Sequence, residues 1–224
     1  MNRNQTYEEN YLKYFASYIM EYYYEPYYHS KKTIFLCGKG VKRKDSKRKK
    51  VAGVVLSGEG SKKYDILLPE QIFGYLHRGE RSFDLDSMER ELAQSVDAII
   101  IIPESQGSIS ELNAFVQYPS LIEKIICLVF EPAGKPKSYL DLGPIKKLRK
   151  KTGKVFNAND LDDRALEKLI SKELTSIPEF TSKGLSLNAF LSENFLLPAI
   201  YLLQPLPVEI LIRLYSYGSD VLED

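Results

Sequence analysis

The stretch DAIIIIPESQGSISELNAF, residues 97–115, decides the fold. It opens on an apolar, β-branched run, which is typical of a strand buried on both faces of a sheet. A short loop over residues 103–107 separates this run from a helical segment that begins near Ile109, for which Ser108 is a suitable N-cap. A buried strand that leads through a tight loop into a helix is the repeating unit of α/β proteins.

Other apolar runs alternate with helical segments in the same way. The predicted strands cover residues 33–37 (TIFLC), 64–68 (YDILL), 97–102, 125–130 (IICLVF) and 155–156. The predicted helices between them cover residues 45–57, 70–77, 86–95, 108–118 and 144–151. This alternation predicts an α/β fold with a mostly parallel five-stranded sheet flanked by helices. Ligands of such sheets bind at the carboxyl ends of the strands.

The two ends of the chain follow a different pattern. Nine of the 16 tyrosines lie within residues 1–28. A helix is predicted over residues 6–24, with Pro26 ending it, and one face carries Tyr7, Tyr11, Tyr14 and Tyr18. We expect this stripe to pack on the α/β domain and its C-terminal helices; the alternative is an interface with another subunit or with nucleic-acid bases.

After the last strand we expect helices only. Asn159 or Asp160 would cap a helix that runs to about residue 176, and two further helices would cover 185–203 and 208–217. The predicted organisation is therefore an N-terminal Tyr-rich helical appendage (1–30), an α/β domain (31–158) and a small C-terminal helical region (159–224).

The composition excludes several classes of protein. The chain has 224 residues, a formal net charge of +1 and 44% hydrophobic residues, as an ordinary globular protein has. A Cys/His zinc site would need Cys37, Cys127, His29 and His77 together, and their spacing matches no zinc motif. No metal is expected, and chemistry would use carboxylates, hydroxyls and backbone groups. No apolar run has membrane-spanning length and the N-terminus is polar, so we expect a cytoplasmic protein.

Two glutamates are the candidate catalytic residues. Glu111 follows Ser108 by three positions, so a purely structural capping box of the two is one interpretation. The other places the Glu111 carboxylate at the ligand crevice, where it would attack or stabilise an oxocarbenium-like sugar carbon. Glu89 stands three residues after Asp86, again in a capping-box pattern, and is the preferred second carboxylate, because N-glycosidic cleavage uses two.

A basic run, KGVKRKDSKRKK at residues 39–50, is either a solvated loop with a first helical turn or a nucleic-acid contact surface. The second interpretation would use Lys42, Arg43, Lys44, Lys47, Arg48, Lys49 and Lys50.

Six segments of the chain together match a known family: IFLCG (34–38), YDILLPE (64–70), Glu89 with LAQSVD (92–97), PESQGSISEL (103–112), LGPIKKLRK (142–150) and ENFLLPAIYLL (193–203). In these segments the chain resembles the nucleoside 2-deoxyribosyltransferase-like effectors of type II bacterial retrons. The resemblance implies a Rossmann-like core that cleaves N-glycosidic bonds, with NAD as the substrate rather than a cofactor. Glu111 takes the family's catalytic glutamate position. The substrate-binding residues would be Cys37, Gly38, Glu70, Glu104, Ser105, Gly107 and Ser108.

The resemblance also implies a biological role, namely antiphage defence by NAD depletion. Reverse transcriptase and its RNA–DNA hybrid (msDNA) would hold the effector, as an oligomer or filament, until infection. The relatives carry a C-terminal winged-helix domain, whereas this sequence ends at Asp224, so we expect no complete domain of that kind. Two alternatives stay open. One is a nucleoside or nucleotide deoxyribosyltransferase or phosphoribohydrolase of the same fold, and the other is a non-catalytic nucleotide-sensing scaffold subunit.

Overall fold

A computed structural model describes residues 3–28, 31–40, 46–70, 84–130, 143–178 and 189–221. The chain divides into two compact units. The α/β unit comprises residues 32–179, and the helical unit combines residues 1–31 with residues 180–224. The helix that follows residue 159, which the sequence analysis assigned to the C-terminal region, therefore belongs to the α/β unit.

The α/β unit is built on a five-stranded sheet in which every pair of neighbours is parallel, as predicted. The strands are β1 (Lys32–Cys37), β2 (Tyr64–Leu67), β3 (Ala98–Ile101), β4 (Ile125–Val129) and β5 (Val155–Asn157). Their order is β2-β1-β3-β4-β5, so the direction of winding reverses between β1 and β3. In doubly wound sheets the ligand crevice lies at this reversal, outside the carboxyl ends of the strands.

The helices of this unit are α3 (Lys47–Val55), α4 (Gly60–Lys63), α6 (Leu85–Ser95), α7 (Gln106–Phe115), α8 (Pro119–Ile122), α10 (Pro144–Lys151) and α11 (Asp163–Ser176). Most of the predicted helix 70–77 lies outside the described residues. α11 begins later than predicted, because its N-cap is Asp162, whose Oδ1 accepts from the Ala165 N–H at 2.7 Å.

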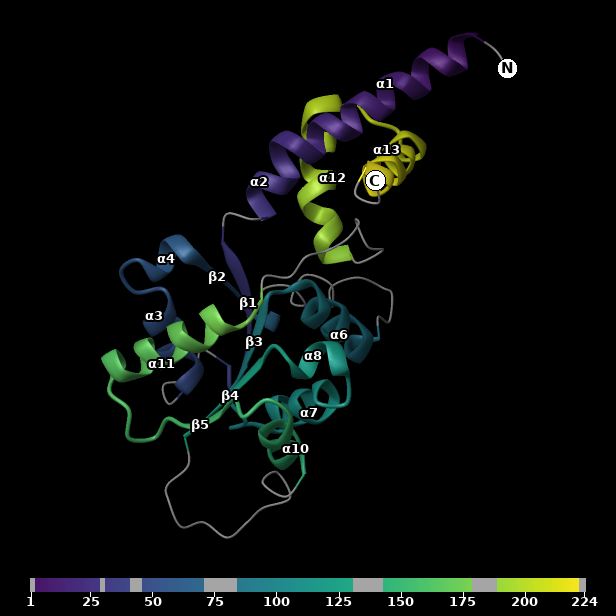
Figure 1. Cartoon of the computed structure of the whole chain (residues 1–224). Coiled ribbons are helices and arrows are strands. Elements are labelled where there is room, and N and C mark those ends of the chain that lie inside the picture. The colour runs from purple at the N-terminus through teal and green to yellow at the C-terminus, as the bar shows by residue number, and fades with distance from the viewer. Residues whose placement is uncertain are drawn as a thin grey trace. The chain divides into compact units, whose positions relative to one another are not determined.

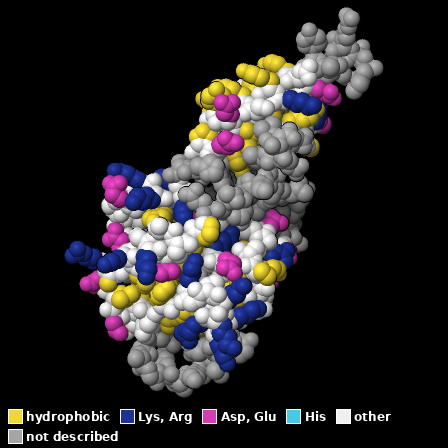
Figure 2. All heavy atoms as spheres, in the orientation of Figure 1, with side chains coloured by type: hydrophobic (Ala, Val, Ile, Leu, Met, Phe, Trp, Pro, Cys, Tyr) yellow, Lys and Arg dark blue, Asp and Glu magenta, His cyan; other side chains and the backbone are white. Residues whose placement is uncertain are grey.

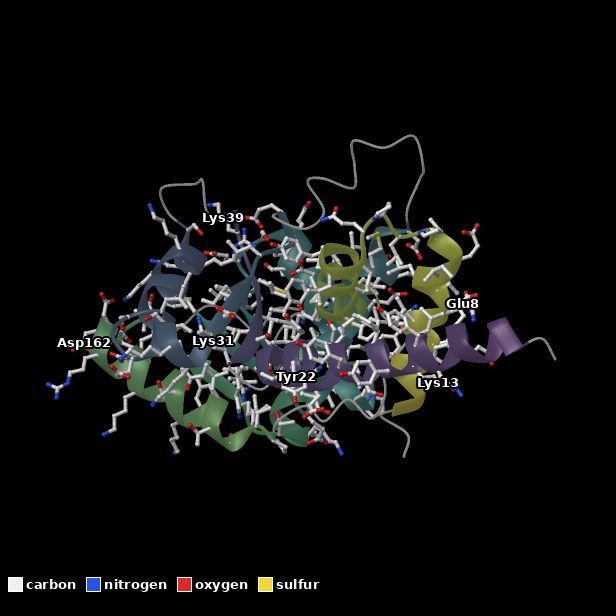
Figure 3. All side chains as sticks on the ribbon, turned by 90° about the horizontal axis from the view of Figure 1, so that it is seen from above. Glu8, Lys13, Tyr22, Lys31, Lys39 and Asp162 are labelled. Atoms are coloured by element: carbon white, nitrogen blue, oxygen red, sulfur yellow. The ribbon has the colours of Figure 1, made fainter. Side chains whose placement is uncertain are left out.

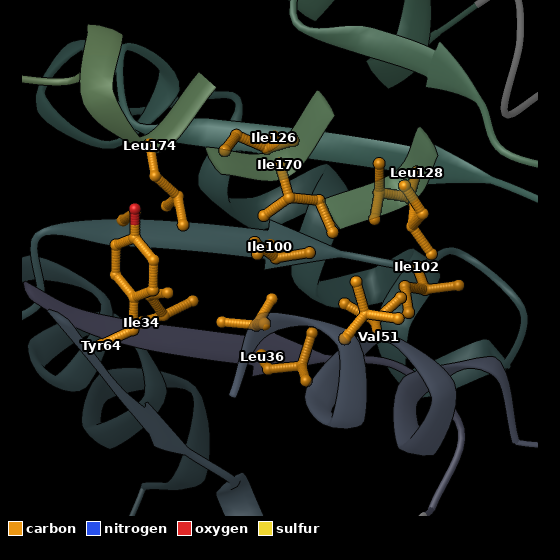
Figure 4. Close-up of a cluster of buried hydrophobic side chains, with 14 of the residues drawn as sticks. Ile34, Leu36, Val51, Tyr64, Ile100, Ile102, Ile126, Leu128, Ile170 and Leu174 are labelled. Carbon is orange, nitrogen blue, oxygen red and sulfur yellow. The ribbon is translucent and has the colours of Figure 1, made fainter. Parts of the chain in front are cut away.

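Successive side chains along the strands pack alternately against two layers of helices, one on each face of the sheet. Ile34 and Leu36 of β1 pack with Ile100, with Val51 of α3 and with Ile170 of α11 in one buried cluster (Figure 4). Phe35 points to the opposite face, as alternation requires, and its ring lies 6.2 Å from the ring of Phe115 on α7. The sheet is therefore covered by α3 and α11 on one face and by α6, α7, α8 and α10 on the other (Figure 1).

The helical unit joins the two ends of the chain. Its elements are α1 (Arg3–Ile19), the π-helical turn η1 (Met20–Tyr24), α2 (Glu25–Tyr28), α12 (Ala189–Leu203) and α13 (Val208–Val221). Its buried core consists of Leu12, Ala16, Ile19, Met20, Tyr24, Phe195, Ala199 and Leu214. Glu8 of α1 forms an ion pair of 2.8 Å with Arg213 of α13 (Figure 3). In the described part of the chain, no helix is both long and apolar enough to cross a membrane.

Two predictions about the N-terminal helix are wrong. Pro26 does not end it, because the helix widens into the π turn at 20–24 and Pro26 is accommodated in the short helix that follows. The tyrosine stripe is not the packing face either. Tyr11 and Tyr14 are 59% and 67% exposed, and the side chain of Tyr7 lies outside the described residues. The buried face carries Leu12, Ala16 and Ile19 instead.

Candidate functional site

The position expected for the ligand crevice is the carboxyl end of β1 and β3, because the chain leaves these neighbouring strands toward opposite faces of the sheet. After β1 it continues to α3 on one face, and after β3 it enters α7 on the other (Figure 1). The two loops are fastened to each other, since the backbone N–H of Lys39 donates to Glu104 Oε1 at 3.2 Å. Glu104, a predicted substrate contact, thus holds the loops together in this structure.

The start of α7 differs from the prediction in a way that matters for Glu111. The N-cap is Ser105, not Ser108. Ser105 Oγ accepts from the Ser108 N–H at 3.2 Å, and Ser108 Oγ accepts from the Ser105 N–H at 3.1 Å. The two serines therefore form the capping box between themselves, and the structural interpretation that paired Ser108 with Glu111 is wrong. Gly107 is exposed in the first turn, and a Cβ there would meet nothing within 4 Å.

Glu111 is released from capping and lies largely buried in the second turn of α7. Its carboxyl shares a side-chain hydrogen bond with the thiol of Cys37, while Oε2 is buried without a partner. Burial raises the pKa of Glu111, and the Cys37 hydrogen bond and the nearby Arg48 guanidinium act against that rise. Cys37 is fully buried, so it supports Glu111 from within the sheet.

Glu89 lies on α6 and is coupled to Glu111. The helix begins after Asp84, not after Asp86 as predicted, and Asp84 accepts a hydrogen bond from the Ser87 hydroxyl. The predicted capping box of Asp86 with Glu89 is therefore absent from this described segment. Burial, followed by the charges of Glu111 and Asp86, raises the pKa of Glu89 to about 7. The two predicted catalytic carboxyls thus lie in one electrostatic environment.

Arg48 is the site residue that the sequence reasoning missed. Its side chain is 3% exposed, and Nη2 binds Oε1 of Glu70, the predicted substrate contact after β2, at 2.5 Å. Nη1 donates to the Leu36 carbonyl at 3.5 Å, and Nε is buried without a partner. A Cβ added to Gly38 would lie 3.3 Å from Arg48 Cβ, so the glycine admits this arginine. Helical spacing with the buried Val51 and Val55 is the signal that would have found it.

The described residues of the basic run are divided between buried and exposed positions. Arg48 is buried, which contradicts its predicted nucleic-acid role, and residues 42–44 lie outside the described residues. Lys50 is held by the Leu161 carbonyl at 3.2 Å and by Asp163 at 3.3 Å. Lys47 and Lys49 remain exposed. Lys and Arg side chains are interspersed with Asp and Glu on the visible face of the α/β unit (Figure 2).

None of the described His, Cys, Asp and Glu side chains gather in a group of three that could hold a metal ion. The carboxyl ends of the strands instead bring Glu70 and Glu111 near the Arg48 guanidinium, and Glu89 near Glu111. Carboxyls with raised pKa values beside a cation are arranged for acid–base chemistry or for stabilising a cationic reaction centre.

The STM3845 retron effector protein family model matches residues 44–222, which include Arg48, Glu89 and Glu111. The chain belongs to the STM3845 retron effector protein family. This retron effector is 34% identical over 187 residues to the Escherichia coli protein described as "Retron Ec86 putative ribosyltransferase/DNA-binding protein". That similarity covers 76% of this chain and 60% of the relative.

A second Escherichia coli relative, described as "Retron Ec73 putative ribosyltransferase/DNA-binding protein", is 30% identical over 118 residues. The similarity covers 52% of this retron effector and 37% of that relative. The chain thus spans less than two thirds of the length of each of these curated relatives. Both names describe a glycosyl-transfer activity, which agrees in kind with the N-glycosidic chemistry expected of Glu111.

Proposed function

We propose that this retron effector cleaves the N-glycosidic bond between nicotinamide and ribose in NAD, with water as the acceptor. The observation that carries the proposal is the Glu111 carboxyl, which lies buried at the crevice of the sheet with Oε2 unpartnered and with Glu89 beside it. The ribosyltransferase names of the two relatives support the same type of bond cleavage.

The two carboxyls would divide the work. Nicotinamide in NAD leaves as a neutral base when the bond from its ring nitrogen to C1′ breaks, so no acid has to protonate it. The ionised Glu111 would stabilise the positive charge that develops at C1′. Glu89, whose pKa is about 7, would accept a proton from water as the water oxygen bonds to C1′, giving ADP-ribose. Cys37 and Arg48 favour the ionised form of Glu111 that this step needs.

The rest of the substrate would lie along the loops of the crevice. The first backbone N–H groups of α7 carry the partial positive charge of a helix N-terminus, which suits a phosphate of NAD. Exposed Gly107 leaves room for the phosphate to approach that turn. The Ser105 and Ser108 hydroxyls bond each other at 3.0 Å and would shape this loop.

The test is release of nicotinamide from NAD, measured by mass spectrometry with the purified full chain and with cells that express it. Glu111→Gln keeps the shape of the side chain and removes the charge, and we expect at least about a 100-fold loss of activity. Glu123→Gln is the matched control, because the Glu123 side chain is exposed and lies in the short connection just before β4. An active Glu111→Gln variant would refute the assigned role. Release of bases from deoxynucleosides or AMP, but not from NAD, would refute the substrate.

As a member of the retron effector family, the protein would act in antiphage defence by depleting NAD. We propose that reverse transcriptase and msDNA hold it inactive, as an oligomer or filament, in the bacterial cytoplasm. Of the described basic run, Lys47 and Lys49 are the exposed residues for a nucleic-acid contact. Coexpression of all three components, with and without phage infection, should show NAD loss only after infection and only with Glu111 intact.

A further inference from the structure

The crevice contains a buried hydrogen-bond donor that the protein itself does not satisfy. The Arg48 side chain is 3% exposed, and its Nε has no partner, although both terminal nitrogens of the guanidinium are bonded. A buried donor without a partner costs about 1–3 kcal/mol. Such a group at the reversal point of a doubly wound sheet is expected to be satisfied by what binds there.

Arg48 and Glu111 approach the crevice from its two walls. Arg48 comes from α3 and packs on Gly38. A Cβ added to Gly38 would lie 3.3 Å from Arg48 Cβ. Glu111 comes from α7 and is bonded to Cys37, the residue next to Gly38. The Arg48 charge is near enough to oppose the rise that burial causes in the pKa of Glu111. An unpartnered donor and the unpartnered Oε2 of Glu111 therefore lie at the same strand end.

The partner of Arg48 Nε is expected to be a neutral acceptor rather than an anion. The positive charge of Arg48 is already paired with Glu70 at 2.5 Å. Glu89 and Glu111 add negative potential, which would repel a phosphate at this point. A sugar hydroxyl can accept from Nε–H without adding charge. The hydroxyl next to an anomeric carbon that faces Glu111 is the 2′-hydroxyl.

We propose that Arg48 Nε–H donates to the 2′-hydroxyl of the substrate sugar, so that this site selects ribosyl over 2-deoxyribosyl groups. The inference rests on the proposed function, because it places C1′ of the sugar at Glu111. It distinguishes this site from that of a deoxyribosyltransferase of the same fold, which is one of the alternative activities. Arg48 is then a specificity residue that contacts the substrate beside the reacting carbon.

The experiment compares the affinity of the full chain for ADP-ribose and for 2′-deoxy-ADP-ribose by isothermal titration calorimetry. We expect the ribosyl ligand to bind on the order of 10-fold more tightly, since the deoxy ligand leaves Nε–H unpaired. In Arg48→Lys, which keeps the charge but lacks Nε–H, the preference should fall to about 2-fold or less. Arg164→Lys, the same substitution at an exposed position of α11, is the control and should keep the preference.

Equal affinity of the unmodified chain for the two ligands would overturn the proposal, and so would failure to bind either. A preference that survives in Arg48→Lys would also overturn it. If Arg48→Lys does not fold, the two ligands on the unmodified chain decide alone. Nicotinamide release separates the two proposals: release without a 2′-hydroxyl preference refutes only the role of Arg48. A preference without release refutes only NAD hydrolysis.

Discussion

Gly38→Ala tests whether Arg48 occupies the space above the end of β1. The new Cβ would lie 3.3 Å from Arg48 Cβ, 3.3 Å from Ile102 Cβ and 3.5 Å from Arg48 Cδ. Carbon atoms pack best at about 3.5–4.0 Å, so two contacts are too short by a few tenths of an ångström. Neither neighbour yields easily, because Ile102 is in the core and Arg48 is bonded to Glu70 and to the Leu36 carbonyl. Overpacking of this kind costs about 1–3 kcal/mol.

The assay is thermal unfolding together with nicotinamide release, and Gly53→Ala is the matched control. A Cβ at Gly53, inside α3, meets nothing within 4 Å. This control should stabilise the protein by about 0.4–1 kcal/mol, whereas Gly38→Ala should lower Tm by roughly 2–4 °C per kcal/mol lost. Because Arg48 must shift, Gly38→Ala should also lose activity, and Gly53→Ala should not. A Gly38→Ala variant with unchanged Tm and full activity would show that Arg48 does not fill this space.

Four further expectations concern Glu89, the two cysteines and the helical unit. Burial and the Glu111 charge raise the pKa of Glu89 to about 7. Activity that needs the ionised Glu89 should therefore rise as the pH increases through about 7. The pH–rate profile of Glu89→Gln should lack this rise. The native state keeps the Glu89 proton that the unfolded chain loses near pH 4.5, so stability should fall as pH rises from about 4.5 to 7. Burial raises the pKa of Cys37 and takes that of Cys127 to about 12, so a thiol reagent at pH 8 should label two cysteines only after unfolding, and labelling of the native chain would contradict their placement. Phe195→Ala should destabilise the helical unit by about 3–5 kcal/mol in denaturant unfolding, whereas Tyr11→Ser should change stability by less than about 0.5 kcal/mol; equal effects would refute the assignment of the packing face.

The sheet was predictable because parallel strands buried on both faces leave an unmistakable pattern. Each predicted apolar run corresponds to a strand, with ends that differ by at most one residue. The position of Glu111 near the carboxyl ends of the strands followed from the same reasoning, since α7 begins directly after the loop that follows β3. The cap of α7 did not follow, because Ser105 and Ser108 are chemically equal candidates. The loop contact between Glu104 and Lys39 is a tertiary constraint that local sequence does not contain.

The face of α1 was mispredicted for a related reason. Tyr11, Tyr14 and Tyr18 repeat with helical spacing, but so do Leu12, Ala16 and Ile19 on the neighbouring stripe. Periodicity alone does not tell which of the two stripes is the packing face. Burial favours the aliphatic one, because every buried tyrosine hydroxyl needs a hydrogen-bond partner. Charge misled the prediction at Arg48 in the same manner, since a basic run suggests a solvated surface while helical spacing directs this one member inward.

The burial of Arg48 is expensive for the fold, which indicates where its benefit lies. Removing a guanidinium from water costs several kcal/mol, and a partner that stays 43% exposed, as Glu70 does, recovers only part of it. An apolar side chain at this position would extend the contact of Val51 with the core at no such cost. The arginine instead leaves Nε–H unsatisfied and opposes the rise that burial causes in the pKa of Glu111. Neither feature stabilises the protein when no ligand is bound. Both would contribute to binding or catalysis when a sugar occupies the site. The same residue thus opposes the rise that burial causes in the pKa of Glu111, and its Nε–H would let the site distinguish a ribosyl from a deoxyribosyl group.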